Sequence, residues 1–147
     1  MADTKSLRAA VQSLFPSNVK ARFGQVPAGE TLPWSFVLIS IPSVTDRRLA
    51  GNVSTRRCVI RVRAAGANDT AAGAVAQNCA NALEGVRPTA SGWSCSPIRQ
   101  LNDDAQVYQD RDTTVGTLHP IVAALDFEFF ASVSPVTPPP DPEEVAP

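Results

Sequence analysis

Near the start of the chain, apolar residues recur every three or four positions. This spacing places them on one side of a helix over residues 4–15. The apolar positions of this segment are Leu7, Ala10, Val11, Leu14 and Phe15. Thr4 or Asp3 can cap the first turn, and Pro16 marks the end because a proline cannot continue a helix. The pattern predicts an amphipathic helix in this part of the chain.

A second helical pattern begins at Asn68 or Asp69 and runs to about Glu84. Asn and Asp are favoured helix caps, and Gly85 suits the position after the last turn. The apolar stripe of this helix consists of Ala72, Val75, Ala76, Cys79, Ala82 and Leu83. Because small alanine side chains dominate the stripe, we expect this helix to lie close against a sheet.

Two segments alternate apolar and polar side chains, which is the period of a strand with one buried face. In residues 55–65, one face carries Cys58, Ile60, Val62 and Ala64, and the other carries Arg57, Arg61 and Arg63. In residues 120–130, one face carries Ile121, Ala123, Leu125, Phe127 and Phe129, and the other carries Val122, Ala124, Asp126, Glu128 and Phe130. These segments are the clearest strands that the sequence predicts.

Three weaker strand patterns complete the body of the chain. Residues 34–41 form a compact run of β-forming side chains. Residues 86–99 and 104–110 are more polar and predict two short strands, with Trp93 and Tyr108 as their aromatic anchors. The sequence therefore contains five expected strands in all.

The order of these elements is helix, strand, strand, helix and three strands. This order predicts an α+β fold, in which two α-helices pack on one face of a mostly antiparallel β-sheet. Residues 17–33 and 43–54 are rich in turn-forming residues, and we expect them to be long loops, the second of them mobile.

The chain divides into a body, residues 1–131, and a tail, residues 132–147. Its 147 residues, 44% of them hydrophobic, suit a single domain. The tail holds six of the 13 prolines and three acids but no basic residue, so we expect an extended, disordered segment. It is either a solvated terminus or a strap that lies on a neighbouring subunit. The body keeps 13 basic and 11 acidic residues, a net charge of +2.

Composition and charge exclude several classes of protein. A net charge of −1 argues against a dedicated nucleic-acid-binding domain, which would be strongly basic. No apolar run approaches the roughly 18 residues that cross a membrane, and the N-terminal residues lack the pattern of a signal peptide. We therefore expect a soluble protein that is made in the cytoplasm.

The search for catalytic and cofactor motifs is negative. The sequence contains no nucleophile elbow, phosphate-binding loop, dinucleotide fingerprint or zinc-protease motif. Cys58, Cys79 and Cys95 lack the spacing of metal ligands and are interpreted as small buried hydrophobic residues. His119 has no acid beside it and is expected in a turn. We therefore expect a protein without catalytic residues, cofactor or metal.

The one unusual constellation is a group of arginines within 17 residues, with Asp46 as the only acid among them. This arginine cluster consists of Arg47, Arg48, Arg56, Arg57, Arg61 and Arg63. Guanidinium groups pair well with carboxylates and phosphates. The cluster is therefore a solvated sheet face paired with Asp126 and Glu128, a subunit interface, or a contact with DNA phosphates. If the two clear strands are neighbours, Arg61 and Arg63 share a face with these two acids.

Five pieces of the sequence carry a family resemblance. They are residues 6–11 of the first helix, the entry to a strand at 32–37, the arginine-bearing strand at 56–62, the helix end at 81–85, and the late strand with Ala123, Leu125, Phe127 and Phe129. In layout, the chain resembles the tail-terminator proteins of long-tailed phages over residues 4–131. This tail-completion family includes the minor tail protein U of lambdoid phages. The proline-rich tail is not part of the family pattern.

The resemblance implies a structural role and offers no catalytic residues. Such proteins form a ring, typically a hexamer, on the last ring of the major tail-tube protein. They stop tube growth and present a surface to a head-completion or neck adaptor protein, and genomic DNA passes through the lumen without sequence-specific binding. The implied location is the tail–neck junction of the virion, after assembly in the host cytoplasm and without membrane contact.

Two alternative functions stay open. The first is another neck component of the same particle, such as a head-completion adaptor or a tail-to-head joining protein. The second is a cytoplasmic ligand-binding domain or enzyme. Because arginines that line a lumen would hold DNA and slow its exit, we expect most of the arginine cluster to face protein carboxylates. The interface residues are therefore expected to be the arginine cluster together with Asp126 and Glu128.

Overall fold

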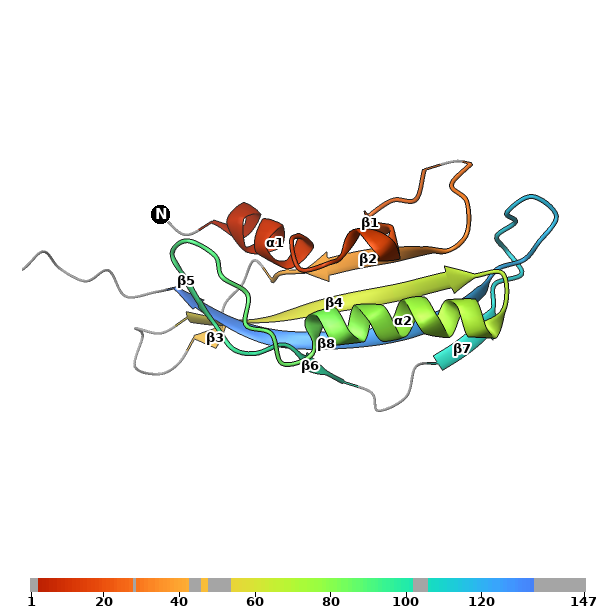
Figure 1. The fold of residues 1–147 in the computed structure, drawn as a ribbon. Helices are drawn as coiled ribbons and strands as arrows, with labels where there is room; N and C mark the ends of the chain where they lie inside the picture. The colour runs from red at the N-terminus through yellow and green to blue at the C-terminus, as the bar shows by residue number, and fades with distance from the viewer. Residues whose placement is uncertain (1–2, 28, 43–45, 48–53, 102–105, 134–147) are drawn as a thin grey trace, which may run out of the picture.

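The computed structural model describes residues 3–27, 29–42, 46–47, 54–101 and 106–133. These residues form the helices α1 (Thr4–Gln12) and α2 (Asp69–Leu83) and the short 3-10 helix η1 (Ser17–Val19). The strands are β1 (Ala21–Phe23), β2 (Trp34–Ser40), β3 (Asp46–Arg47), β4 (Ser54–Gly66), β5 (Trp93–Cys95), β6 (Arg99–Gln100), β7 (Gln106–Gln109) and β8 (Ile121–Val133). Figure 1 shows an elongated molecule built along the two long strands β4 and β8.

All eight strands belong to one sheet, whose main path is β1-β2-β4-β8-β5. Strand β3 also pairs with β4, and β6 and β7 pair with β8. The centre of the sheet is the antiparallel pair of β4 and β8, which runs in register from Thr55 opposite Ser132 to Gly66 opposite Ile121. Within the described part of the chain, β1 and β2 are the single parallel pair. The structure confirms the α+β fold with a mostly antiparallel sheet.

Both α-helices pack on the same face of the sheet. Leu7 and Val11 of α1 and Val75 and Leu83 of α2 belong to one buried cluster with the strands. The strand residues of this cluster include Cys58, Ile60, Val62, Ala64, Ala123, Leu125, Phe127 and Phe129. These are the positions that the alternation assigned to the apolar faces. The alanine stripe of α2 lies over β4 and β8 (Figure 1), as the sequence predicts.

The helix starts follow the predicted capping chemistry. The Asp3 side chain accepts a hydrogen bond from the Ser6 backbone amide, and Asn68 accepts one from Ala71 at 2.8 Å. Helix α1 ends at Gln12, earlier than the predicted residue 15, although Leu14 and Phe15 still pack against the core.

Two segments differ from the prediction because their pairing is not local. Residues 17–33 were expected to be a loop, but they contain η1 and the strand β1, whose Ala21 pairs with Ser35 of β2. Three residues are too short to display a strand period, so only the partner strand reveals them. Strand β3 lies within the expected loop 43–54, Ser54 already belongs to β4, and residues 43–45 and 48–53 are outside the described residues.

The later strands also begin and end at other residues than the sequence predicts. The expected strand 86–99 is two short strands, β5 and β6, and Pro97, which has no amide hydrogen for a ladder, lies between them. Strand β8 continues three residues past the predicted end at Phe130, because Trp93, Ser94 and Cys95 of β5 pair with its last part. The expected disordered tail begins at residue 132, but Ser132 and Val133 belong to β8, where they pair with β5. The rest of the tail, residues 134–147, lies outside the described residues.

Candidate functional site

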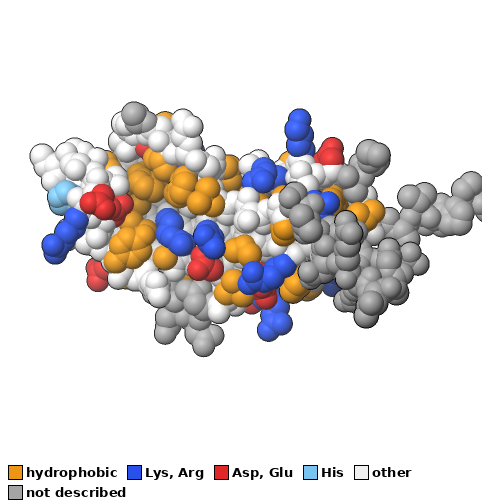
Figure 2. Space-filling model, turned by 180° about the vertical axis from the view of Figure 1, so that it is seen from behind, with side chains coloured by type: hydrophobic (Ala, Val, Ile, Leu, Met, Phe, Trp, Pro, Cys, Tyr) orange, Lys and Arg blue, Asp and Glu red, His pale blue; other side chains and the backbone are white. Residues whose placement is uncertain are grey.

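The face of the sheet opposite the helices, here called the open face, is the candidate site. Alternation of side chains along β2, β4 and β8 brings aromatic, aliphatic and charged residues to this face. Its main residues are Trp34, Phe36, Leu38, Arg57, Arg61, Arg63, Val122, Asp126, Glu128 and Phe130, with Tyr108 from β7. Figure 2 shows this face, with hydrophobic side chains gathered toward the end that carries His119 and charged side chains among them.

Two cross-strand ion pairs join β4 to β8 on the open face. Arg57 Nε donates to Glu128 Oε2 at 2.6 Å, and Arg63 Nη1 donates to Asp126 Oδ1 at 3.3 Å. Arg61 lies directly opposite Asp126 in the register. The prediction that Arg61 and Arg63 share a face with both acids is therefore confirmed. Exposed pairs of this kind contribute roughly 0.2–1 kcal/mol each, so they favour the register without determining the fold.

The other members of the arginine cluster lie elsewhere. Arg56 follows the strand alternation onto the helix side, where its guanidinium lies 5.3 Å from the centre of the Trp93 ring. Its Nη1 donates to the Pro42 carbonyl at 3.2 Å. Arg47 belongs to β3, but its side chain is not described, and Arg48 lies outside the described residues. The structure thus divides the sequence cluster between two faces of the sheet.

Large apolar side chains stand exposed between the charged ones. Leu38 is 44% exposed, Phe130 42% and Tyr108 46%. Leu38 lies opposite Arg61, and Phe130 lies opposite Arg57. Exposed aromatic and aliphatic residues that alternate with arginine are typical of protein–protein contact surfaces. The sequence pattern did not predict this exposure, since Tyr108 was expected to be an aromatic anchor and the charges were the visible feature of this face.

A groove of about 1020 Å³ lies at one end of the open face. Its walls come from two segments far apart in the sequence, one with residues 26–27 and 29–32 and the other within 110–118, and its lining includes Trp34, Phe36 and Tyr108. Trp34 is 8% exposed, and its buried indole Nε1 has no hydrogen-bond acceptor among the described residues. An unsatisfied buried donor is uncommon, and here it belongs to an aromatic-lined groove.

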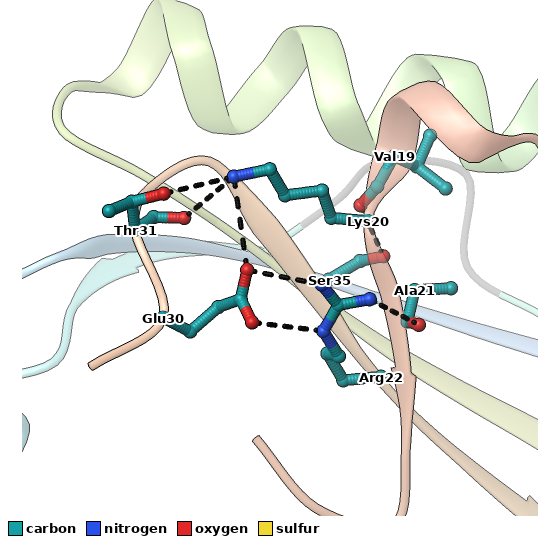
Figure 3. Close-up of polar contacts among 7 residues, drawn as sticks. All are labelled: Val19, Lys20, Ala21, Arg22, Glu30, Thr31 and Ser35. Carbon is teal, nitrogen blue, oxygen red and sulfur yellow. Dashed lines mark hydrogen bonds and ion pairs between the residues drawn. The ribbon is translucent and has the colours of Figure 1, made fainter. Parts of the chain in front are cut away.

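Polar contacts hold the first wall of the groove against β1 (Figure 3). Arg22 donates to both carboxylate oxygens of Glu30, each at 3.1 Å, and Lys20 Nζ lies 3.8 Å from the same carboxylate. Lys20 also donates to the hydroxyl oxygen of Thr31 at 3.0 Å. The hydrogen bond from Arg22 lowers the pKa of Glu30 below its usual value of 4.5. This segment of the expected loop is therefore tied to the sheet.

The described residues offer little chemistry beyond contact. Cys58, Cys79 and Cys95 are all buried, as predicted, and burial raises the pKa of the Cys58 and Cys79 thiols to about 11. His119 lies in the segment before β8, where its Nδ1 is 3.0 Å from the Thr113 carbonyl oxygen. Across the described ranges, no three His, Cys, Asp or Glu residues are grouped as metal ligands would be. Neither α-helix in those ranges is long and apolar enough to span a membrane.

Comparison with known proteins identifies the family. The family model for the tail completion protein gp17 matches residues 5–122. The comparison with curated proteins finds no match. Among solved structures, a chain of the virion of a native gene transfer agent particle shares the fold, with a TM-score of 0.52 and 19% identity. The alignment covers 88% of this chain and 90% of that chain. The chain therefore belongs to the tail completion protein gp17 family and is a structural protein of the tail or neck of a virion.

Proposed function

We propose that this protein is the tail terminator of its particle. It forms a ring, a hexamer in its family's manner, on the end of the tail tube, stops tube polymerisation and joins the tail to a neck adaptor. The single observation that supports this role is the open face, where Leu38, Tyr108 and Phe130 stand exposed between ion pairs. Membership in a tail completion family supports a surface of this kind as a contact within the particle.

Ring closure follows from the geometry of repeated contacts. A head-to-tail interface joins two different surfaces of neighbouring copies. The copies close into a ring when the rotation from one copy to the next is a whole-number fraction of a full turn. The open face supplies one of those surfaces, and the tail-tube protein and the neck adaptor take the upper and lower rims. Each weak apolar or ionic contact then recurs at every subunit, so its contribution is multiplied around the ring.

The ion pairs of the open face suit an interface between subunits better than the lining of a DNA channel. DNA is a dense line of negative charge, and a lumen lined by free arginines would retain it. Arg57 and Arg63 instead face the carboxylates of Glu128 and Asp126. We therefore include the arginine cluster, with Arg47 and Arg48, among the interface residues of this proposal.

Charge substitutions on the open face test the proposal. Leu38→Glu and Phe130→Glu place a carboxylate on an exposed position, so the monomer keeps its fold while a buried interface would not form. We expect both variants to fail to join tails in a complementation assay and to form no rings by electron microscopy. Val107→Glu is the matched control, because Val107 is 53% exposed and points to the other face of β7.

Assembly of both open-face variants at the wild-type level would exclude this face as the interface. Loss of the gene separates the terminator from another neck component. Without a terminator, tail tubes grow to uncontrolled lengths, whereas without a neck adaptor, tubes keep their normal length and remain unattached to heads. Protein that is monomeric both in solution and in the particle would contradict the ring.

A further inference from the structure

We propose that the groove at the end of the open face binds the proline-rich segment, residues 134–147, of a neighbouring copy of this chain. This inference rests on the proposed function, since the ring brings the neighbouring copy into place. The ring can exist without this contact, so the two can fail separately.

The lining of the groove matches a polyproline ligand. Extended proline-rich segments dock into grooves lined by aromatic rings. A polyproline helix is already rigid before it binds, so it loses little conformational entropy on binding. Trp34, Phe36 and Tyr108 supply such rings, and Leu32 and Leu118 add apolar surface.

The buried indole of Trp34 provides a directional contact. Its Nε1 has no acceptor among the described residues. A polyproline helix makes no internal hydrogen bonds, so its backbone carbonyls are available as acceptors. Such a carbonyl satisfies this buried donor when the Trp34 side chain turns Nε1 toward the bound segment.

The segment itself has the required composition. Pro138, Pro139 and Pro140 are consecutive, and Asp141, Glu143 and Glu144 follow them. The segment carries three negative charges and no positive one, whereas the body has a net charge of +2.

The charged lining of the groove consists of two carboxylates, Glu30 and Asp110, and one guanidinium, Arg63. Arg22 pairs with Glu30, and Arg63 pairs with Asp126. The acidic residues follow the three prolines in the sequence, so the prolines are the part of the segment that the groove accommodates.

Reach along the chain excludes the three consecutive prolines of the same molecule. Val122 lines the groove at the start of β8, and Val133 ends that strand at the other end of the molecule (Figure 1). At about 3.3 Å per residue, the strand between them spans roughly 36 Å. A polyproline helix advances about 3.1 Å per residue, so Pro140 lies at most roughly 22 Å beyond Val133. Pro138, Pro139 and Pro140 therefore do not reach the groove of their own chain, and the groove that they would fill belongs to a neighbour.

Photo-crosslinking in the full-length chain tests this contact. Benzoylphenylalanine replaces Tyr108, which is exposed in the groove, and in a second protein Val107, which is its neighbour on the opposite face. Rings assembled from equal amounts of 15N-labelled and unlabelled chains are irradiated, and the crosslinked peptides are mapped by mass spectrometry. Ring mass is measured on the same sample.

The proposal predicts that the probe at position 108 crosslinks to residues 134–147. Each crosslinked pair should join one labelled and one unlabelled peptide in part of the sample, which shows that the contact is between two chains. The probe at position 107 should give no such crosslink. Replacing Pro138, Pro139 and Pro140 by alanine should abolish the crosslink while the charges are kept. Three outcomes would overturn the tail contact and leave the ring untouched. They are rings that lack this crosslink, crosslinks confined to one chain, and crosslinks to another segment or to the tube protein. If the position 108 variant forms no rings, Thr114, an exposed residue of the same lining, carries the probe. Monomers in every preparation overturn the ring and, with it, this contact.

Discussion

At the scale of single residues, the structure shows at which glycines an added methyl group would change the stability of the fold. Gly66 joins β4 to the start of α2, and a Cβ built on it would lie 2.5 Å from the Ala72 amide nitrogen. Gly73 lies in the middle of α2, and a Cβ built there would meet no atom within 4 Å. The same substitution is therefore expected to have opposite effects at two nearby glycines.

Gly66→Ala should lower the free energy of unfolding by about 1–3 kcal/mol, because the backbone of α2 must move to accept the methyl group. Gly73→Ala should raise it by about 0.4–1 kcal/mol, because alanine restricts the unfolded chain and favours the helix. Urea unfolding followed by circular dichroism measures both. Equal effects at the two sites would contradict the close approach at Gly66.

The pH dependence of stability should report the contact between Arg22 and Glu30. The pKa of Glu30 in the folded state lies below its ordinary value of 4.5, so the charged carboxylate stabilises the fold above that pH. This contribution is lost as the pH falls through the lowered pKa. Glu30→Gln should therefore be less stable than the wild type at pH 7, and the difference should shrink well below pH 4.5. Denaturant unfolding at both pH values measures it.

Arg22→Gln serves as the matched variant, because it removes the other partner of the same contact. It should show the same trend with pH as Glu30→Gln. A stability difference that stays constant between the two pH values would argue against a charged hydrogen bond at the groove wall.

At the scale of elements, the long strand pair β4–β8 has two faces that differ in what they contribute. The helix face buries Phe127 and Phe129 completely beside Ile60 and Val62. The open face carries the exposed ion pair of Arg57 and Glu128. Burial of apolar surface is the dominant stabilising contribution, whereas exposed ion pairs are screened by water.

Substitutions on the two faces of this strand pair should separate these contributions. Phe127→Ala should lower the free energy of unfolding by about 3–5 kcal/mol through the cavity it leaves. Arg57→Ala, 52% exposed at its side chain, should cost no more than roughly 1 kcal/mol but should impair ring assembly. Thermal unfolding and electron microscopy of rings measure the two effects. A stability loss from Arg57→Ala as large as that from Phe127→Ala would assign the open face to folding instead of contact.

At the scale of the whole molecule, the helices cover one face of the sheet and leave the other available for partners. A groove lies at one end of that open face, and the last described residue, Val133, lies at the opposite end. This polarity suits an assembly in which each copy gives its C-terminal segment to the next. The family points to a structural part of a tail, and the open face offers contact surface for that role.

The sequence by itself determined the elements whose pattern is local. The periods of 3.6 and 2 residues predicted α1, α2, β4 and β8 and their buried faces, because a long amphipathic element must present one apolar side to the core. A compact run of β-forming residues predicted β2. The caps Asp3 and Asn68 were predictable for the same reason, since a cap acts within its own first turn. The shared face of Arg61, Arg63, Asp126 and Glu128 followed from alternation once the two strands were taken as neighbours.

Only the tertiary structure decided the features that depend on contacts between distant segments. Strand β1 exists through its pairing with β2, and three residues carry no period that could predict it. Arg56 looked like its neighbour Arg57 in the sequence, but Trp93 lies on its side of the sheet. The groove requires residues 26–27 and 29–32 and the segment within 110–118 to flank Trp34, and no local pattern records that approach. Local spacing determines which side of an element is apolar, whereas the packing of distant segments determines what that side meets.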